Sequence, residues 1–184
     1  MQLHRRQAQG LTLIELLLFI AVVGIALAAM LRVFTTATAA SADPLIRRQQ
    51  LAIAESLLHE VQLMPFTWCD PEDANVTTAT SAAGCASLVE APGPVENSET
   101  RYGPDYFNNV NDYAGFTMTG IRDITNAAVA GLSGYTASVA VTSAALDSLA
   151  AAEALRITVT VSGPDNSSVV LQGWRTRHAP TAPF

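Results

Sequence analysis

One carboxylate in this chain occupies a position where a charge is costly. Glu15 is followed by a run without charged side chains, residues 16–31, and Arg32 is the first charge beyond it. With its flanks the run has about 20 residues, enough for a helix to cross the hydrocarbon core of a bilayer. Acidic residues inside such segments are rare and usually functional. Glu15 is therefore the first candidate functional residue, and we expect a positive charge on a partner to neutralise it.

The apolar residues of this run outweigh the cost of the acid. Its ten large apolar side chains contribute roughly −3 to −6 kcal/mol to insertion, against about +2.5 to +3.5 kcal/mol for an acid at mid-helix. Arg5 and Arg6 lie just before the run, so the positive-inside rule predicts a cytoplasmic amino terminus. The rest of the chain would then lie beyond the membrane, in the periplasm if the cell has two membranes.

Two cysteines are the next candidates for chemistry. Cys69 and Cys85 have 15 residues between them, and a disulfide that closes such a loop is worth about 3 kcal/mol in the chain-entropy model. A zinc site would need more ligands at close spacing, and a redox pair would need the spacing Cys-x-x-Cys. Because the predicted compartment is oxidising, we favour a structural disulfide over free thiols.

Other chemistry has little support in the sequence. Asp70, Glu72 and Asp73 offer the oxygen ligands that calcium prefers, but their spacing is not that of an EF-hand, and we expect solvated acids and no metal site. No nucleophile elbow, phosphate loop or metal-ligand cluster is found, so we predict no catalytic residues, no cofactor and no enzymatic activity. The net charge is −6, and −8 without Arg5 and Arg6, which argues against nucleic acid as a partner.

These candidates would be positioned by helices in the first third of the chain. The small residues 35–42 after the apolar run are compatible with helix, and Asp43-Pro44 predicts a helix restart, with Asp as N-cap and Pro at the first helical position. Two collinear helical pieces with a kink are also compatible with this pattern, because an interior proline removes one backbone hydrogen bond. Met64-Pro65 predicts the end of the helix. Between these points apolar residues recur at helical spacing and form one stripe: Ile46, Ile53, Ala54, Leu57, Leu58, Val61 and Met64.

The carboxyl-terminal third predicts an antiparallel sheet that packs on this stripe. Residues 135–142 and 155–162 alternate apolar and polar side chains, which is the period of strands with one buried face. Residues 163–166 are a turn signal and 168–176 the returning strand of a hairpin. Residues 115–121 are a further candidate strand, and 143–154 a short helix or a wide loop. The predicted fold class is α+β.

The residues around Glu15 resemble a known signal. Gly10-Leu11-Thr12-Leu13-Ile14-Glu15 with the apolar run is similar to the class III signal of type IV prepilins and pseudopilins. The resemblance implies cleavage between Gly10 and Leu11 by an inner-membrane prepilin peptidase and N-methylation of Leu11, where the family usually has Phe. It also implies that Glu15, the fifth mature residue, pairs with the terminal amine of a neighbouring subunit. A secretory signal cleaved near 37–42 is the alternative, but it leaves Gly10 and Glu15 unexplained.

The family implies a type IV pilin-like organisation. This comprises a prepilin leader (1–10), a transmembrane and assembly helix (11–42), an amphipathic helix (43–64) and a periplasmic head (65–184). The protein would be a single-pass inner-membrane protein with a periplasmic head and would later join a surface filament. Its partners would be the prepilin peptidase and other pilin subunits, which it contacts through the amino-terminal helix.

Four further segments resemble the MshD group of minor pilins, from mannose-sensitive haemagglutinin (MSHA) pilus systems. They are residues 41–49, 65–75, 108–113 and 173–177. This resemblance implies a minor pilin that takes part in pilus assembly, attachment and adhesion. A minor pseudopilin of a type II secretion system shares the signal and the fold, and genome neighbourhood would distinguish it. A membrane-tethered periplasmic enzyme is the third possibility, and the amino terminus of the mature protein would exclude it.

Overall fold

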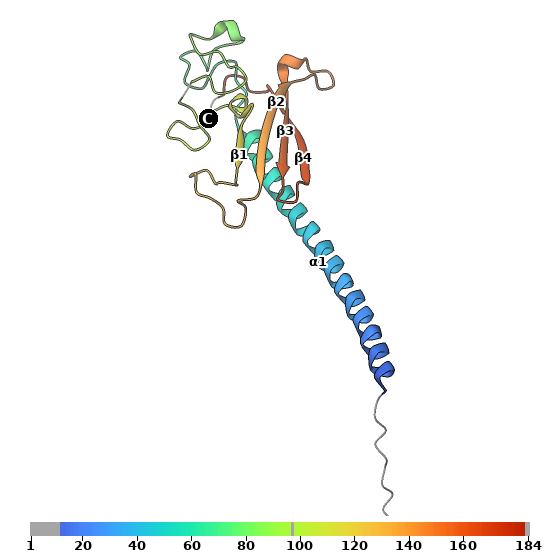
Figure 1. Ribbon diagram of the computed structural model, residues 1–184. Coiled ribbons are helices and arrows are strands. Elements are labelled where there is room, and N and C mark those ends of the chain that lie inside the picture. The colour runs from blue at the N-terminus through green and yellow to red at the C-terminus, as the bar shows by residue number, and fades with distance from the viewer. Residues whose placement is uncertain (1–11, 97, 183–184) are drawn as a thin grey trace, which may run out of the picture. The chain divides into compact units, whose positions relative to one another are not determined.

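The computed structural model describes residues 12–96 and 98–182, with the backbone alone for residues 36–43. The chain divides into two compact units at Pro44/Leu45. Helix α1 (Leu13–Leu63) passes through both units. The second unit holds four strands and three short 3₁₀ helices (Figure 1): β1 (Thr117–Thr119), β2 (Thr136–Ser143), β3 (Ala154–Ser162), β4 (Ser168–Thr176), η1 (Ala82–Gly84), η2 (Val110–Tyr113) and η3 (Ala151–Glu153).

Helix α1 continues through the position where the sequence predicts a restart. Pro44 lies inside the helix, so Asp43-Pro44 does not begin a second one. The fixed φ of proline fits helical backbone, and the ring costs one backbone hydrogen bond. The small residues before it favour or tolerate helix. The predicted restart is therefore wrong, whereas the predicted end near Met64-Pro65 agrees with the last helical residue, Leu63.

The four strands form one antiparallel sheet in the order β1-β2-β3-β4. Strands β3 and β4 are paired from Ala154↔Thr176 to Ser162↔Ser168. The predicted turn joins them, and Asn166 adopts φ 62° there, a left-handed conformation that asparagine tolerates. Strand β4 begins and ends where the predicted hairpin places it, while β1 keeps only three residues of the predicted 115–121.

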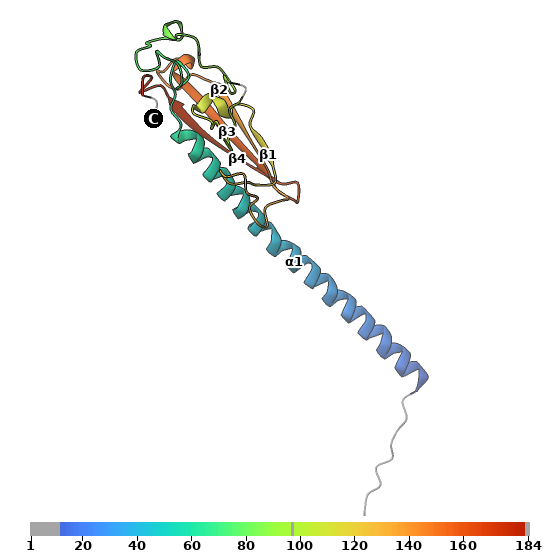
Figure 2. The same ribbon diagram turned by 90° about the vertical axis from the view of Figure 1, so that its left-hand side faces the viewer.

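The core lies between this sheet and the part of α1 that belongs to the second unit (Figure 2). The predicted helical stripe supplies Ile53, Ala54, Leu57 and Val61, which are at most 9% exposed. The inward side chains of the strands complete the core: Met118, Ala137, Val139, Val141, Leu155, Ile157, Val159 and Val161. This arrangement confirms the predicted α+β fold, with a long amino-terminal helix packed on a carboxyl-terminal antiparallel sheet.

The long connection between α1 and β1 is irregular but well packed. Tyr113 is 1% exposed, and its ring meets Phe107 and Phe116 edge-on, with centroids 4.9 and 6.1 Å apart. Val110 N–H donates to the Pro65 carbonyl at 3.0 Å. Most aromatics of this segment therefore attach the loop to the core, whereas Tyr106 is 53% exposed.

A disulfide closes the first part of this loop. Cys69 and Cys85 are bonded, with Cα atoms 5.5 Å apart, a usual separation for an unforced bridge. Cys69 is fully buried and packs with Val76, Ala79 and Trp68 in a small apolar cluster of its own. The disulfide thus constrains a segment, residues 69–85, that contributes little to the main core.

We expect loss of this bridge to destabilise the head. Replacing both cysteines with serine should lower the free energy of unfolding by about 3 kcal/mol, since the unfolded loop regains its freedom. Denaturant unfolding of the purified chain would measure this. Alkylation of non-reduced protein from the periplasm should label neither Cys69 nor Cys85. Two labelled thiols per chain would contradict the prediction.

Candidate functional site

The first residues that the structure describes belong to the candidate assembly segment around Glu15. Thr12 precedes the first helical residue, Leu13, and Glu15 is the third residue of α1. The Thr12 hydroxyl accepts from the Glu15 N–H at 3.4 Å, and Glu15 Oε2 accepts from the N–H and the hydroxyl of Thr12 at 3.4 Å. This reciprocal pattern is a capping box, which satisfies donors that a helix start leaves free. An acid in the first turn also complements the helix dipole.

The capping box is a contribution of Glu15 that our sequence analysis missed. The signal is present as Thr12-x-x-Glu15 before an apolar run, which is the pattern of such boxes. Gly10 and Leu11, the predicted cleavage and methylation positions, lie outside the described residues. Among the described residues no basic side chain forms an ion pair with Glu15. Its hydrogen bonds are long and local, so its charge is not neutralised within the described part of the chain.

The helix that follows Glu15 presents an apolar surface. Residues Leu13–Thr35 are long and apolar enough to cross a membrane, judged by length and composition. All these side chains are exposed, with Leu13 79% and Ile25 73% accessible. So large an exposed apolar area indicates a membrane or a protein partner. A carboxylate at the edge of this surface becomes costly once the surface is covered, unless a cation accompanies it.

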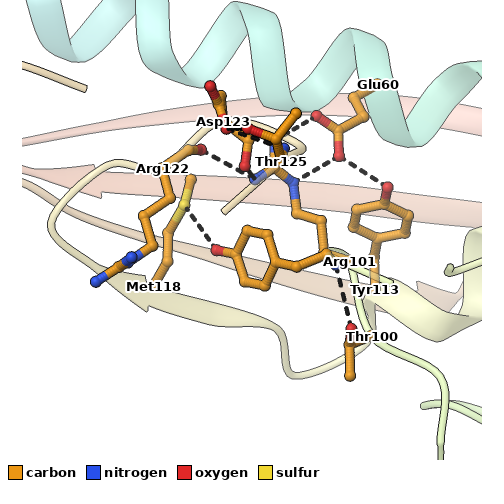
Figure 3. Close-up of polar contacts among 9 residues, drawn as sticks. Glu60, Thr100, Arg101, Tyr113, Met118, Arg122, Asp123 and Thr125 are labelled. Carbon is orange, nitrogen blue, oxygen red and sulfur yellow. Dashed lines mark hydrogen bonds and ion pairs between the residues drawn. The ribbon is translucent and has the colours of Figure 1, made fainter. Parts of the chain in front are cut away.

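A second polar group lies inside the head, where Glu60 of α1 meets Arg101 (Figure 3). Arg101 Nε donates to Glu60 Oε1 at 2.7 Å and its Nη2 to Oε2 at 2.8 Å. The Tyr113 hydroxyl donates to Glu60 Oε1 at 2.8 Å. Burial and the neighbouring Glu60 charge raise the pKa of Tyr113 above its usual value, so the hydroxyl stays a donor. The two-point Arg–carboxylate pair fixes the loop at residue 101 to the helix.

Removing the guanidinium should destabilise the head. Arg101→Met leaves Glu60 without its cation. We expect the free energy of unfolding to fall by about 3 kcal/mol, because breaking a buried pair leaves one charge inside the protein without a counter-charge. Changing Glu60 to Gln in the same chain should recover part of the loss. Arg122→Met removes an exposed guanidinium and should change stability by less than about 1 kcal/mol. Equal losses in both arginine variants, measured by denaturant unfolding, would contradict this.

The acids of the loop after Cys69 are more buried and hydrogen-bonded than the sequence suggests. Asp73 is 4% exposed, and its carboxylate accepts from the backbone N–H groups of Asn75, Ala86, Ser87 and Leu88 at 2.7–3.0 Å. These bonds hold the pKa of Asp73 well below its usual range. Asp70 is also buried, and only Glu72 is exposed. The expectation of solvated acids is therefore wrong for Asp70 and Asp73.

A family model for the prokaryotic N-terminal methylation motif matches residues 5–31. No curated protein and no solved structure matches the chain. The matched segment contains Gly10, Leu11 and Glu15 and the whole apolar run, residues 16–31. The motif supports a type IV pilin-like protein, that is, a pilin or pseudopilin subunit. It implies processing by a prepilin peptidase and assembly with other pilins, and it is a structural motif rather than a catalytic one.

Proposed function

We propose that the chain is a minor pilin of an MSHA-type pilus, cleaved after Gly10, N-methylated at Leu11 and added to the filament through its amino-terminal helix. One observation carries the proposal. Glu15 lies in the first turn of an exposed apolar helix, inside a segment that matches the methylation motif. Before assembly the helix would anchor the protein in the inner membrane with the head in the periplasm.

The charge of Glu15 explains why assembly depends on this segment. In a single inserted subunit the carboxylate stays near the membrane face, where a charge costs little. In a filament the exposed apolar side chains of α1 would pack against those of neighbouring helices, and Glu15 would lose water. The amine of Leu11 on a neighbouring subunit is the cation that cleavage makes available there. Pairing the two satisfies both charges and sets the register between subunits.

The MSHA-type assignment rests on the resemblance of segments of the head to that group, and three of these segments meet in the structure. Thr67 joins all three, because its hydroxyl accepts from Asn109 Nδ2 at 2.7 Å and its carbonyl accepts from Arg177. The Arg177 guanidinium also lies 3.6 Å from the ring centre of Phe66 and 3.8 Å from that of Trp68. The segments 108–113 and 173–177 thus both contact the segment 65–75.

Deletion of the gene in its own host would test the assignment. We expect loss of surface pili and of pilus-dependent attachment, restored by the wild-type chain, while secretion of type II substrates continues. An epitope-tagged chain should appear in the sheared pilus fraction. Normal piliation with lost secretion would instead assign the chain to a type II secretion system as a minor pseudopilin.

A further inference from the structure

Four acidic side chains, which we call the acid cluster, are buried in the loops between α1 and β1. They are Asp70, Glu90, Glu99 and Asp112. Asp70, Glu99 and Asp112 are 0, 7 and 1% exposed, and Glu90 is partly buried. These loops are drawn in green to yellow in Figure 1. Acids are almost never buried without a partner, so the group requires an explanation.

Backbone pairing directs two of these acids to one face. Cys69 and Val89 form an antiparallel bridge, flanked by hydrogen bonds from Asp70 N–H to Leu88 and from Glu90 N–H to Trp68, at 3.0 and 3.1 Å. Residues next to a bridge point to the face opposite the bridged pair. Asp70 and Glu90 are therefore diagonal neighbours on the same side of the paired segments, within reach of common partners.

The segment before and within η2 gathers the other two acids. Asn108 Nδ2 donates to Glu99 Oε1 at 2.8 Å, and its backbone N–H donates to Asp112 Oδ2 at 2.9 Å. Asn111 Nδ2 donates to Glu90 Oε2 at 3.2 Å. Three of the four carboxylates thus contact residues 108–112, and Asp70 interacts electrostatically with the same three.

Each carboxylate has one oxygen with a donor and one without. The oxygens without a donor are Asp70 Oδ2, Glu90 Oε1, Glu99 Oε2 and Asp112 Oδ1, and the amide oxygen of Asn108 is a fifth. In the described part of the chain these five are all the buried side-chain oxygens that lack a partner. Buried polar atoms normally have one. That four of these oxygens belong to acids that sense one another's charge points to a cation as their ligand.

No protein cation serves this purpose among the described residues. Arg177 is close enough to sense Glu90, but its ion-pair contact is with Glu153, at 3.9 Å. Burial first, and then the charges of its neighbours, raise the pKa of Glu90 to about 9 and that of Glu99 to about 7. Burial likewise raises the pKa of Asp112 to about 6. Neither ion pair among the described residues involves the acid cluster.

We propose that the acid cluster is a calcium site, in which the ion bridges the paired segments around Asp70 and Glu90 to the segment 108–112. Carboxylate and amide oxygens are the ligands that calcium prefers, and its variable coordination suits five protein oxygens plus water, whereas magnesium demands strict octahedral geometry. Among the described residues no group of three acidic, histidine or cysteine side chains is arranged to hold a metal ion as it stands. We therefore expect the ion to draw the free oxygens inward. The inference concerns the head alone and is independent of the proposed function.

Thermal unfolding of the purified full chain in detergent tests this site, with calcium, magnesium or EDTA added. We expect the midpoint to rise with calcium, at concentrations of up to about 10 mM, which would saturate even weak extracellular sites. Magnesium should have a much smaller effect. No calcium-dependent shift, or an equal shift with magnesium, would overturn the proposal.

Two variants and a matched control separate binding from charge screening. Glu90→Gln and Glu99→Gln keep the oxygen that accepts from an asparagine but remove the charge. The calcium concentration needed for half the shift should rise by at least about tenfold in each, because loss of even an outer partner typically costs about that much in affinity. In EDTA both variants should be at least as stable as the wild type, because a neutral amide replaces an acid that is costly to bury. Glu72 is an exposed acid of the same loop, so Glu72→Gln should respond to calcium like the wild type. If Glu72→Gln weakened the response to calcium as much as Glu99→Gln does, the proposed site would be contradicted.

Discussion

Replacing Glu15 with alanine should leave the chain inserted, cleaved and stable in the membrane, yet nearly absent from sheared filaments. The physical reason is the difference between the two environments. Near the membrane face the acid costs little, whereas in a bundle of apolar helices its removal leaves the partner amine buried without a counter-charge, at a cost of roughly 3 to 5 kcal/mol. Immunoblots of the membrane and pilus fractions would measure how much of the subunit is in each. Wild-type levels in the pilus fraction would contradict the pairing.

The capping box supplies the controls for this experiment. Glu15→Gln retains an oxygen that can accept from Thr12 but removes the charge, so it should fail to assemble like the alanine variant. Thr12→Ala removes the cap and keeps the charge; it should weaken the helix start by about 1 kcal/mol and still allow assembly. If Thr12→Ala fails and Glu15→Gln assembles, helix capping rather than charge pairing explains the requirement.

Gly10→Glu should abolish the mature protein altogether. The resemblance to prepilins implies that a residue without a side chain is needed before the cut, so the leader should stay attached and the subunit should not enter pili. A gel would resolve the larger precursor from the processed chain. Gln7→Glu introduces the same charge three residues upstream, and we expect normal cleavage there. Mature-sized protein from the Gly10→Glu variant would contradict the prediction.

Side-chain periodicity was enough to predict most of the fold. The stripe through Ile53, Leu57 and Val61 predicts the buried face of α1, and alternation predicts β2 and β3. The turn signal at 163–166 predicts β4 as the antiparallel partner of β3. All these signals are local, because each depends on neighbouring residues. At Pro44 the sequence favoured a restart and left collinear helical pieces open, since Asp-Pro is a good helix start and the sequence alone does not weigh one lost hydrogen bond against an uninterrupted helix.

The functional residues were predictable only where they are close in sequence. Glu15 stands out because its neighbours are apolar, and Thr12-x-x-Glu15 carries a capping signal that was available but overlooked. The Glu60–Arg101 pair joins residues 41 positions apart. The acid cluster likewise combines Asp70 with three acids from later loops. Contacts of this kind arise from the path of an irregular loop, for which no periodic pattern exists.

The amino terminus of the protein taken from cells tests the central claim most directly. Mass spectrometry of the amino-terminal peptide should show a chain that begins at Leu11 with a methyl group on its amine, and no peptide from residues 1–10 in the filament fraction. That terminus would establish the processing that frees the proposed partner of Glu15. A chain that begins at Met1, or after a cut within residues 37–42, would contradict the account, because the apolar helix would then be a plain anchor or a secretory signal.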